Sequence, residues 1–303
     1  MTLQQLFYSI TISESGSMNK AAESLFISQP TLTKSIKELE SELGFSIFIR
    51  SGKGIELTND GRDFIIYAKQ VFQQYEILKD KFDSSNSRKK KFGISSQHYS
   101  FAVKAFTDLI NKYDTSEYEF AFRETTTRDV IDDVGNMKSE IGILFFSDYN
   151  NKVIEKNLRD NDLEFNHLID CNACVYLSKN HPLADRDEVS FEDLNPYPCI
   201  SFEQRDADSI YYAEEILAEK DYHRMIKLSD RGSALGIINE LDAYTLCSGI
   251  ISDEINGTDY KMLPLTGDGA DAVMHIGYIT KRNITMSPIG EEYIDIIKET
   301  LST

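Results

Sequence analysis

The sequence predicts a small α+β domain, a long linker helix and a larger α/β domain. Three observations support this prediction. Residues 1–58 have the pattern of three short helices and a β-hairpin, residues 59–82 carry an unbroken helical repeat, and residues 92–297 alternate between strand and helix patterns. A chain of 303 residues is also long enough for about two domains, each with its own core.

The charge is distributed unevenly along the chain. The formal net charge of −18 argues against a nucleic-acid partner, because phosphate binding needs clustered lysine and arginine. However, residues 1–92 hold 13 basic against 11 acidic side chains, whereas residues 93–303 hold 19 against 39. The acidity therefore belongs to the larger domain, and the first part of the chain remains compatible with DNA.

Capping residues divide the first part of the chain into three helices. A first helix with apolar residues at helical spacing ends near Gly16, and Ser17 is a candidate N-cap for a second helix. Ser28 is a candidate N-cap for a third helix, with Pro30 in its first turn, where the missing N–H costs little.

The third predicted helix has two contrasting sides. Its apolar residues cluster on one side at about 100° per residue, and they are Leu32, Ile36, Leu39 and Leu43. The other side presents small, hydroxyl and ammonium groups, as a helix entering a DNA major groove requires. An ordinary solvated amphipathic helix would show the same pattern. The side chains of this second side and its flanks are Pro30, Thr31, Thr33, Lys34, Ser35, Lys37 and Ser41.

A β-hairpin follows the third helix. Residues 45–58 have the pattern of strand, tight turn and strand, with Arg50 and Lys53 at the tip. A basic hairpin beside three helices could reach the DNA backbone or minor groove while the third helix occupies the major groove.

The predicted linker helix, residues 59–82, carries a heptad repeat. A helix of about 24 residues is about 36 Å long, which exceeds the needs of a small domain, so we expect the seam to pair two subunits. Packing of the seam against its own domain is the alternative. The seam positions are Gly61, Phe64, Ala68, Val71, Tyr75, Leu78 and Phe82.

The acidic remainder alternates between the two patterns, which implies parallel strands with crossover helices. The predicted strands are residues 92–94, 118–122, 141–146, 173–177, 224–228 and 273–278. The predicted helices are residues 101–113, 130–137, 210–218, 234–241 and 289–297.

Two residue patterns in this chain resemble those of a known family, the LysR-type transcriptional regulators. The first group resembles the family's winged helix-turn-helix and comprises Gly16-Ser17-Met18, Ala21-Ala22, Leu25, Ser28-Gln29-Pro30-Thr31-Leu32-Thr33-Lys34-Ser35-Ile36, Leu39-Glu40, Leu43-Gly44, Phe48, Arg50, Leu57-Thr58 and Gly61. The second resembles the middle of its effector domain and comprises His181-Pro182-Leu183-Ala184, Leu194, Tyr197-Pro198 and Ile200-Ser201-Phe202.

The resemblance implies an architecture and a set of DNA contacts. It implies a winged helix-turn-helix domain over 1–58, a dimerising linker over 59–87, and a two-lobe periplasmic-binding-protein-like (type 2) domain over 88–303. Lobe I would comprise about 88–162 and 267–303, and lobe II about 163–266. The implied DNA-binding residues are Ser28, Gln29, Pro30, Thr31, Thr33, Lys34, Lys37, Arg50 and Lys53.

The chain also departs from the family pattern. Lysines stand at 34 and 37 where family members often carry arginine, which weakens the expectation of bidentate guanine contacts. Gly142 stands where many relatives carry aspartate, so the ligands of relatives should not be assumed for this chain.

An effector site is expected where strands end and helices begin, because ligands of α/β sheets bind there. The hydroxyl and N–H groups at these positions suit a carboxylate or another small anion, with arginine as countercharge, although each residue alone could simply cap a helix. The expected effector-binding residues are Ser95, Ser96, Gln97, Thr125, Thr126, Thr127, Ser201, Phe202, Asp230 and Arg231. The possible countercharges are Arg123, Arg128, Arg205 and Arg231.

Other kinds of site are not expected. No cofactor-binding loop or nucleophile motif occurs, and the five histidines show no metal-ligand spacing. Cys171 and Cys174 would point to opposite faces of one strand, so neither metal nor thiol chemistry is expected from them. No segment has the ~20 apolar residues of a membrane span or the features of a secretory signal, and four dispersed cysteines fit the cytoplasm.

We therefore predict a cytoplasmic, ligand-responsive regulator that is not an enzyme. Its partners would be double-stranded operator or promoter DNA, a small-molecule effector, and further copies of the chain in a dimer or tetramer. The alternative is a solute-binding or catalytic α/β protein whose N-terminal helices serve only for oligomerisation. Such a protein would have no need for the ridge formed by Pro30, Lys34 and Lys37.

Overall fold

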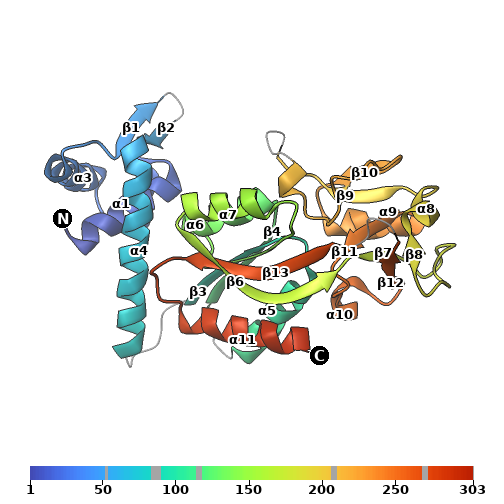
Figure 1. The fold of residues 1–303 in the computed structure, drawn as a ribbon. Coiled ribbons are helices and arrows are strands. Elements are labelled where there is room, and N and C mark those ends of the chain that lie inside the picture. The colour runs from blue at the N-terminus through green and yellow to red at the C-terminus, as the bar shows by residue number, and fades with distance from the viewer. Residues whose placement is uncertain (52–53, 83–89, 114–117, 206–209, 268–271, 303) are drawn as a thin grey trace. The chain divides into compact units, whose positions relative to one another are not determined.

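The computed structural model describes residues 1–51, 54–82, 90–113, 118–205, 210–267 and 272–302. The chain divides into two compact units, Met1–Ser87 and Arg88–Thr303 (Figure 1). Within the described residues, no helix is long and apolar enough to cross a membrane.

The first unit begins with three capped helices, α1 (Leu3–Ser15), α2 (Met18–Ser24) and α3 (Gln29–Leu43). Ser17 and Ser28 cap α2 and α3 as predicted, each accepting a backbone N–H with its side chain. Gly16 and Gly44 end α1 and α3 in the left-handed region, at φ 61° and 79°. The helices enclose a core of Tyr8, Ile12, Ala21, Ala22, Leu32 and Ile36.

A two-stranded wing packs against these helices. Strands β1 (Phe48–Ser51) and β2 (Gly54–Leu57) are antiparallel, with Phe48 opposite Leu57. The N–H of Ile55 donates to the carbonyl of Gly16 at 3.2 Å, which ties the wing to the turn between α1 and α2. The Glu40 carboxylate accepts the N–H of Ile47 at 2.7 Å, which fixes the entry to the wing.

The long helix α4 (Asn59–Phe82) divides the predicted seam in two. Gly61, Phe64 and Ala68 pack within the first unit, so the alternative interpretation is correct for this half. A Cβ at Gly61 would lie 2.1 Å from the carbonyl oxygen of Ile47, so only glycine fits. In the other half, Val71, Tyr75 and Leu78 are 48%, 37% and 58% exposed. The structure does not describe the side chain of Phe82, the last seam position.

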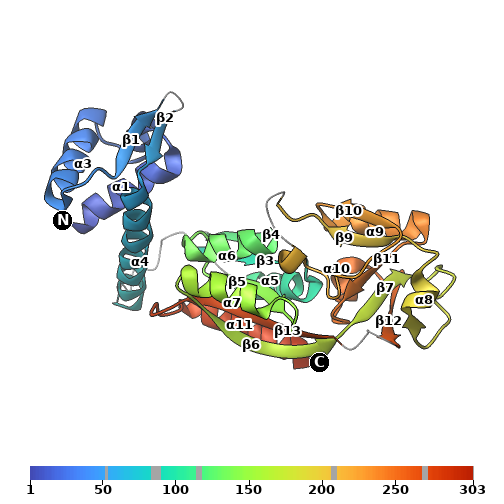
Figure 2. The ribbon, with the colours of Figure 1, turned by 45° about the horizontal axis from the view of Figure 1, so that its top comes forward.

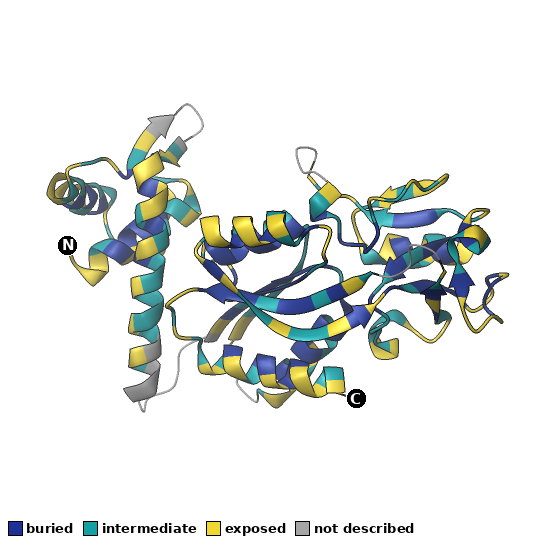
Figure 3. Cartoon of the chain, viewed as in Figure 1, coloured by how far each residue is buried: buried dark blue, intermediate teal, exposed yellow. Residues whose placement is uncertain are grey.

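Lobe I of the second unit is a five-stranded sheet with helices on both faces. Its strand order is β4-β3-β5-β13-β6. Helices α6 and α7 cover one face and α5 and α11 the other, each with its buried side toward the sheet (Figures 1, 2 and 3). Its elements are β3 (Lys90–Ser96), α5 (Ser100–Lys112), β4 (Tyr118–Glu124), α6 (Thr127–Gly135), β5 (Ile141–Phe146), α7 (Asn151–Asp160), β6 (Leu163–Asn172), β13 (Val273–Lys281) and α11 (Pro288–Ser302).

Lobe II contains the second sheet, with the order β10-β9-β11-β7-β12-β8. Helix α9 packs against this sheet, and its Ala234 and Ile238 share a core with Tyr176 and Ile200. Its elements are β7 (Cys174–Ser178), β8 (Val189–Ser190), α8 (Phe191–Leu194), β9 (Cys199–Phe202), the 3₁₀ turn η1 (Ile210–Tyr212), β10 (Met225–Leu228), α9 (Arg231–Leu241), β11 (Tyr244–Cys247), α10 (Asp253–Asn256) and β12 (Tyr260–Thr266).

Three sequence expectations for this unit are wrong. Both sheets are mixed, because β13 runs antiparallel to β5 and β6 in lobe I, and β7 runs antiparallel to β11 and β12 in lobe II. Strand β6 pairs with β13 in lobe I, so the first crossing into lobe II falls at Ala173, between β6 and β7, and not at residue 163. The helix expected over 210–218 is only the turn η1, because Glu214 and Glu215 enter tertiary hydrogen bonds.

Candidate DNA-contacting helix and interlobe cavity

The exposed side of α3 carries the side chains that the sequence predicts. Pro30, Thr31, Lys34 and Lys37 are exposed, and the Lys34 side chain retains 80% of its accessible surface. The ion pair of Lys34 with Glu38, at 3.9 Å, is a surface contact of little energetic weight. A shallow groove runs along this side, lined by Gln29, Pro30, Thr33, Lys34, Lys37, Glu38 and Ser41.

Hydrogen bonds within α3 organise the start of this side. The Ser28 side chain accepts the N–H of Thr31 at 3.3 Å, and Gln29 Nε2 donates to Thr33 Oγ1 at 2.9 Å. Ser28 therefore acts first as the helix cap. The backbone of Arg50 lies in β1 but its side chain is not described, and Lys53 lies outside the described residues.

A strained turn leads into α3. Phe26 adopts φ 54°, a left-handed conformation that is unfavourable for an aromatic residue, and its side chain is 96% exposed. The backbone N–H of Ile27 donates to the carbonyl of Ala22 at 3.0 Å, which holds the turn in place.

A second candidate site is a cavity of about 80 Å³ between lobes I and II, here called the interlobe cavity. Three expected effector-binding residues line it, Gln97 from lobe I and Phe202 and Arg231 from lobe II. Its wall also includes His98, Tyr99, Ser100, Tyr176, Ile200, Glu214, Glu215, Ala234, Ile238, Cys247, Asn256 and Met274.

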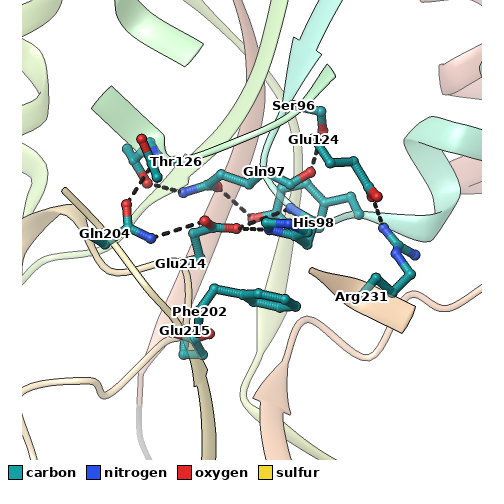
Figure 4. A network of polar contacts seen from close by, with 12 residues as sticks. Ser96, Gln97, His98, Glu124, Thr126, Phe202, Gln204, Glu214, Glu215 and Arg231 are labelled. Carbon is teal, nitrogen blue, oxygen red and sulfur yellow. Dashed lines mark hydrogen bonds and ion pairs between the residues drawn. The ribbon is translucent and has the colours of Figure 1, made fainter. Parts of the chain in front are cut away.

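His98 and Glu214 connect the two lobes across this cavity (Figure 4). His98 Nδ1 lies 2.7 Å from Glu214 Oε2, and the backbone N–H of His98 donates to the same oxygen at 3.1 Å. The imidazole stacks on Phe202 with ring centroids 3.8 Å apart. Burial by itself lowers the pKa of His98, but the hydrogen bond and the negative charge of Glu214 raise it above its ordinary value.

Glu215, the next residue along the chain, also lines the cavity. Its carboxyl group accepts the N–H of Phe202 at 2.7 Å and the hydroxyl of Ser201 at 2.8 Å. Burial and the neighbouring charge of Glu214 raise the pKa of Glu215 to about 7. Ser201 thus contacts a carboxyl group of the protein itself.

Arg231 retains an unused donor at the cavity. Its guanidinium forms an ion pair with Glu124 of lobe I (Figure 4). It also donates to Asn256 Oδ1 at 3.0 Å. Arg231 Nε is buried and has no hydrogen-bond partner among the described residues. Because a buried donor without an acceptor is costly, this N–H favours an additional acceptor at the cavity.

The remaining expected residues serve other contacts. Thr126 caps α6 and Asp230 caps α9, whereas the Ser95 hydroxyl donates to Asp133 at 2.6 Å. The Thr127 hydroxyl accepts from Gln97 at 2.6 Å and donates to a backbone carbonyl at 2.8 Å. Ser96 donates to the carbonyl of Gln97, and the N–H of Thr125 donates to the carbonyl of Ser96. None of these residues lines the cavity within the described parts of the chain.

The three other proposed countercharges are engaged within the protein. Arg205 forms ion pairs with Asp129 and Asp132, Arg123 donates to a serine at 3.2 Å, and Arg128 lies over the ring of Tyr212 at 4.4 Å. Arg231 is therefore the countercharge that the cavity presents.

The cysteines are placed differently from the prediction. Cys171 and Cys174 belong to two strands, β6 and β7, and Cys174 is paired in register with Cys247 of β11. All four cysteines are free. Burial raises the pKa of Cys171 to about 11 and that of Cys247 to about 12, which keeps these thiols protonated and unreactive at neutral pH.

Sequence reasoning missed His98, Glu214 and Glu215. His98 directly follows Gln97 at the end of a predicted strand, so extending the same rule by one residue would have found it. The two glutamates had no such signal, because residues 210–218 have a helical pattern and the structure replaces that helix with a turn.

Comparison with known proteins identifies two matching family models. The model described as a bacterial regulatory helix-turn-helix protein of the lysR family matches residues 3–62, and the LysR substrate binding domain matches residues 97–302. A probable nitrogen assimilation transcriptional activator of Synechocystis sp. is 21% identical over 98% of this chain and 96% of its own. The uncharacterized HTH-type transcriptional regulator YvbU of Bacillus subtilis is 25% identical over 66% of this chain and 65% of its own.

Solved structures share the fold. A full-length OxyR variant from Pseudomonas aeruginosa has a TM-score of 0.68 at 17% identity, covering 99% of this chain and 94% of that one. Full-length CbnR complexed with its target DNA has a TM-score of 0.56 at 16% identity, covering 99% and 100%.

Proposed function

The chain belongs to the LysR family of bacterial transcriptional regulators, and we propose that α3 reads operator DNA while the interlobe cavity binds a small effector. The two sites would be coupled through subunit geometry, because an effector that favours one arrangement of a dimer changes how two reading helices meet DNA. The observation that carries the effector half of this proposal is the unpartnered Nε of Arg231 at the cavity.

The proposal that α3 reads DNA rests on two features: exposed hydrogen-bond donors on one side, and buried residues that fix the helix on the other. The side of α3 that carries Lys34 and Lys37 is unobstructed, whereas the opposite side is fixed by the buried residues Leu32 and Ile36. Lysine at both positions supplies point charges that suit phosphate contacts, and Gln29 and Thr33 offer hydrogen-bonding groups for base edges. Because the first 92 residues carry a balance of only about +2, we expect modest affinity per subunit and strong dependence on salt.

Fluorescence anisotropy with the region upstream of the protein's own gene tests this proposal. Lys34→Ala should weaken binding and lower the slope of log affinity against log salt by about 1 for each phosphate that the lysine neutralises in the parent. Lys298→Ala, at an exposed lysine of α11, is the matched control and should leave both unchanged. Undetectable binding, or equal salt slopes for the parent and Lys34→Ala, would refute DNA reading by this helix.

Self-association through α4 rests on its exposed apolar side chains. Tyr67, Val71, Tyr75 and Leu78 recur at intervals of four, four and three residues, and each is exposed in the single chain. A row of apolar groups at this spacing is stabilised by a partner helix. We expect Val71→Asp to convert dimers or larger assemblies to monomers in light scattering. The exposed control Asp63→Asn on the same helix should not.

The effector we propose is a small carboxylate or a comparable anion. It would accept the Nε–H of Arg231 and lie near His98, whose imidazole is held by Glu214. A cavity of about 80 Å³ is well below the 300–1,000 Å³ of drug-sized sites, so a ligand of few heavy atoms is favoured.

Calorimetric titration with short carboxylates and their uncharged amides tests the effector proposal. At least one carboxylate should bind the parent, its amide should bind much more weakly, and Arg231→Gln should abolish the difference. Arg224→Gln, at an exposed arginine of lobe II, and Thr126→Val, outside the cavity, serve as controls that should bind like the parent. Equal binding of acid and amide, or no loss in Arg231→Gln, would exclude an anion held by this arginine.

A further inference from the structure

Two histidines and one aspartate meet on the surface of lobe I, away from the interlobe cavity. His167 and Asp170 belong to β6, and His275 belongs to β13. His167 Nε2 and His275 Nδ1 lie 2.6 and 2.8 Å from the same oxygen, Asp170 Oδ1. One donor atom from each residue lies within 4.8 Å of the other two.

An irregularity in the strand pairing brings these residues to one face. Residues three apart on a regular strand point to opposite faces, which is why their spacing in the sequence does not indicate a site. Between Ile276 and Gly277 the register of β13 against β6 shifts, so that Leu168 is an extra residue. A bulge of this kind reverses the alternation, and His167 and Asp170 are both exposed on the same side.

The surroundings hold the site in shape. His275 is directly opposite Asp170 in register, so its position is set by the ladder of β6 and β13. Its ring lies 5.9 Å from that of Phe146, which packs in turn on Phe165 at 4.4 Å. A Cβ on residue 277 would lie 2.3 Å from the Phe165 ring, so the packing of Phe165 against β13 requires Gly277.

The donor set suits a transition-metal ion. Two imidazole nitrogens with one carboxylate oxygen match the ligands of open zinc sites, in which water takes the fourth position. With metal–ligand distances of about 2.0–2.1 Å, tetrahedral ligands lie roughly 3.3 Å apart. The present contacts of 2.6 and 2.8 Å would open by about 0.7 and about 0.5 Å, which exposed side chains can accommodate by small rotations. Imidazole donors favour Zn²⁺, Co²⁺ or Ni²⁺ over the oxygen-preferring Mg²⁺ and Ca²⁺.

We propose that His167, Asp170 and His275 form a surface binding site for a divalent transition-metal ion. The site spans the two strands that connect the lobes, since β6 leads into lobe II at Ala173 and β13 is the strand on which the chain returns to lobe I. A bound ion would cross-link these two strands next to the lobe crossings. The proposal is independent of the effector, because the residues of the site line no part of the interlobe cavity.

Calorimetric titration of the chelator-treated full-length protein with ZnCl₂ tests the site. We expect one ion per chain, with the affinity reduced about tenfold or more in His275→Ala and in Asp170→Asn. The control His223→Ala, at an exposed histidine outside the site, should bind like the parent. Melting curves of every variant in chelator establish that each remains folded.

A spectroscopic measurement on the parent protein complements the variants. Co²⁺ bound by nitrogen and oxygen lacks the intense charge-transfer absorption of cobalt thiolates, so its spectrum separates this site from the four cysteines. Nitrogen and oxygen ligation together with weakened binding in the two variants supports the proposal. The absence of binding by Zn²⁺, Co²⁺ and Ni²⁺, unchanged binding in both variants, or a thiolate spectrum would overturn it.

Discussion

Replacing Glu215 by glutamine should remove a strong pH dependence of stability. The pKa of this carboxyl group rises from its ordinary value of 4.5 to about 7 in the folded protein, chiefly because burial disfavours the charged form. At a pH between these two pKa values, the folded protein retains a proton on Glu215 that the unfolded chain releases. Stability therefore falls as pH rises through this range and becomes level above the folded pKa.

The size of the effect follows from the two pKa values. The folded and unfolded pKa values differ by about 2.5, and one pKa unit corresponds to about 1.36 kcal/mol. The protonated Glu215 therefore contributes about 3 kcal/mol to the free energy of unfolding at low pH, and most of this stability is lost between pH 5 and 8. Glutamine preserves the shape and both contacts, because its oxygen can accept the N–H of Phe202 and its amide can donate to the Ser201 hydroxyl. Glu215→Gln should thus gain stability relative to the parent as pH rises.

Urea unfolding between pH 5 and 8 measures this difference. The chain has no tryptophan, so circular dichroism is the suitable signal. Glu219→Gln, at an exposed carboxylate on the same segment, is the matched control and should follow the parent at every pH. If the difference between Glu215→Gln and the parent stayed constant across this range, or shrank as pH rose, the assignment of a neutral buried carboxyl group would be wrong.

Three further substitutions test local features of the fold by thermal or urea unfolding. Phe26→Asn should stabilise the first unit by about 1 kcal/mol, because asparagine tolerates the left-handed conformation at φ 54°. The phenylalanine ring is 96% exposed, so removing it costs no packing, and a loss of stability would contradict this reasoning. Gly142→Ala should cost about 1–3 kcal/mol, since its Cβ would lie 2.7 Å from Ile279 Cγ1, whereas Gly236→Ala, with open space around it in α9, should be neutral or stabilising. Leu39→Ala should cost about 2–5 kcal/mol because this side chain is fully buried, and a cost below 1 kcal/mol would show that the site collapses freely.

The first unit could be predicted almost completely from its sequence. Ser17 and Ser28 cap helices locally, and Gly16 and Gly44 end them, so no distant contact was needed to find the boundaries. The partner of the apolar seam on α4 was harder to predict. An apolar helical repeat does not say whether Ala68 meets its own domain or a second chain.

The sites were only partly predictable, for two physical reasons. The rule about strand ends selects an edge of the sheet, and it found Gln97 and Arg231, but it does not distinguish a side chain facing the cavity from one that caps a helix, as Thr126 does. The remaining features depend on tertiary pairing. The turn at Glu214 and the bulge beside His167 both arise from contacts with residues far away in the sequence.

The missing side chain at Gly61 has a mechanical consequence. The backbone of α4 lies directly against the carbonyl of Ile47, and Ala68 is buried against α1. The wing, α3 and the first half of α4 therefore pack together within the first unit, and we expect them to move as one body. In a dimer held by the second half of α4, a rotation of one α4 helix against the other would then turn both copies of α3 with it. The pairing of two α4 helices would therefore set the distance between the half-sites that the protein can span.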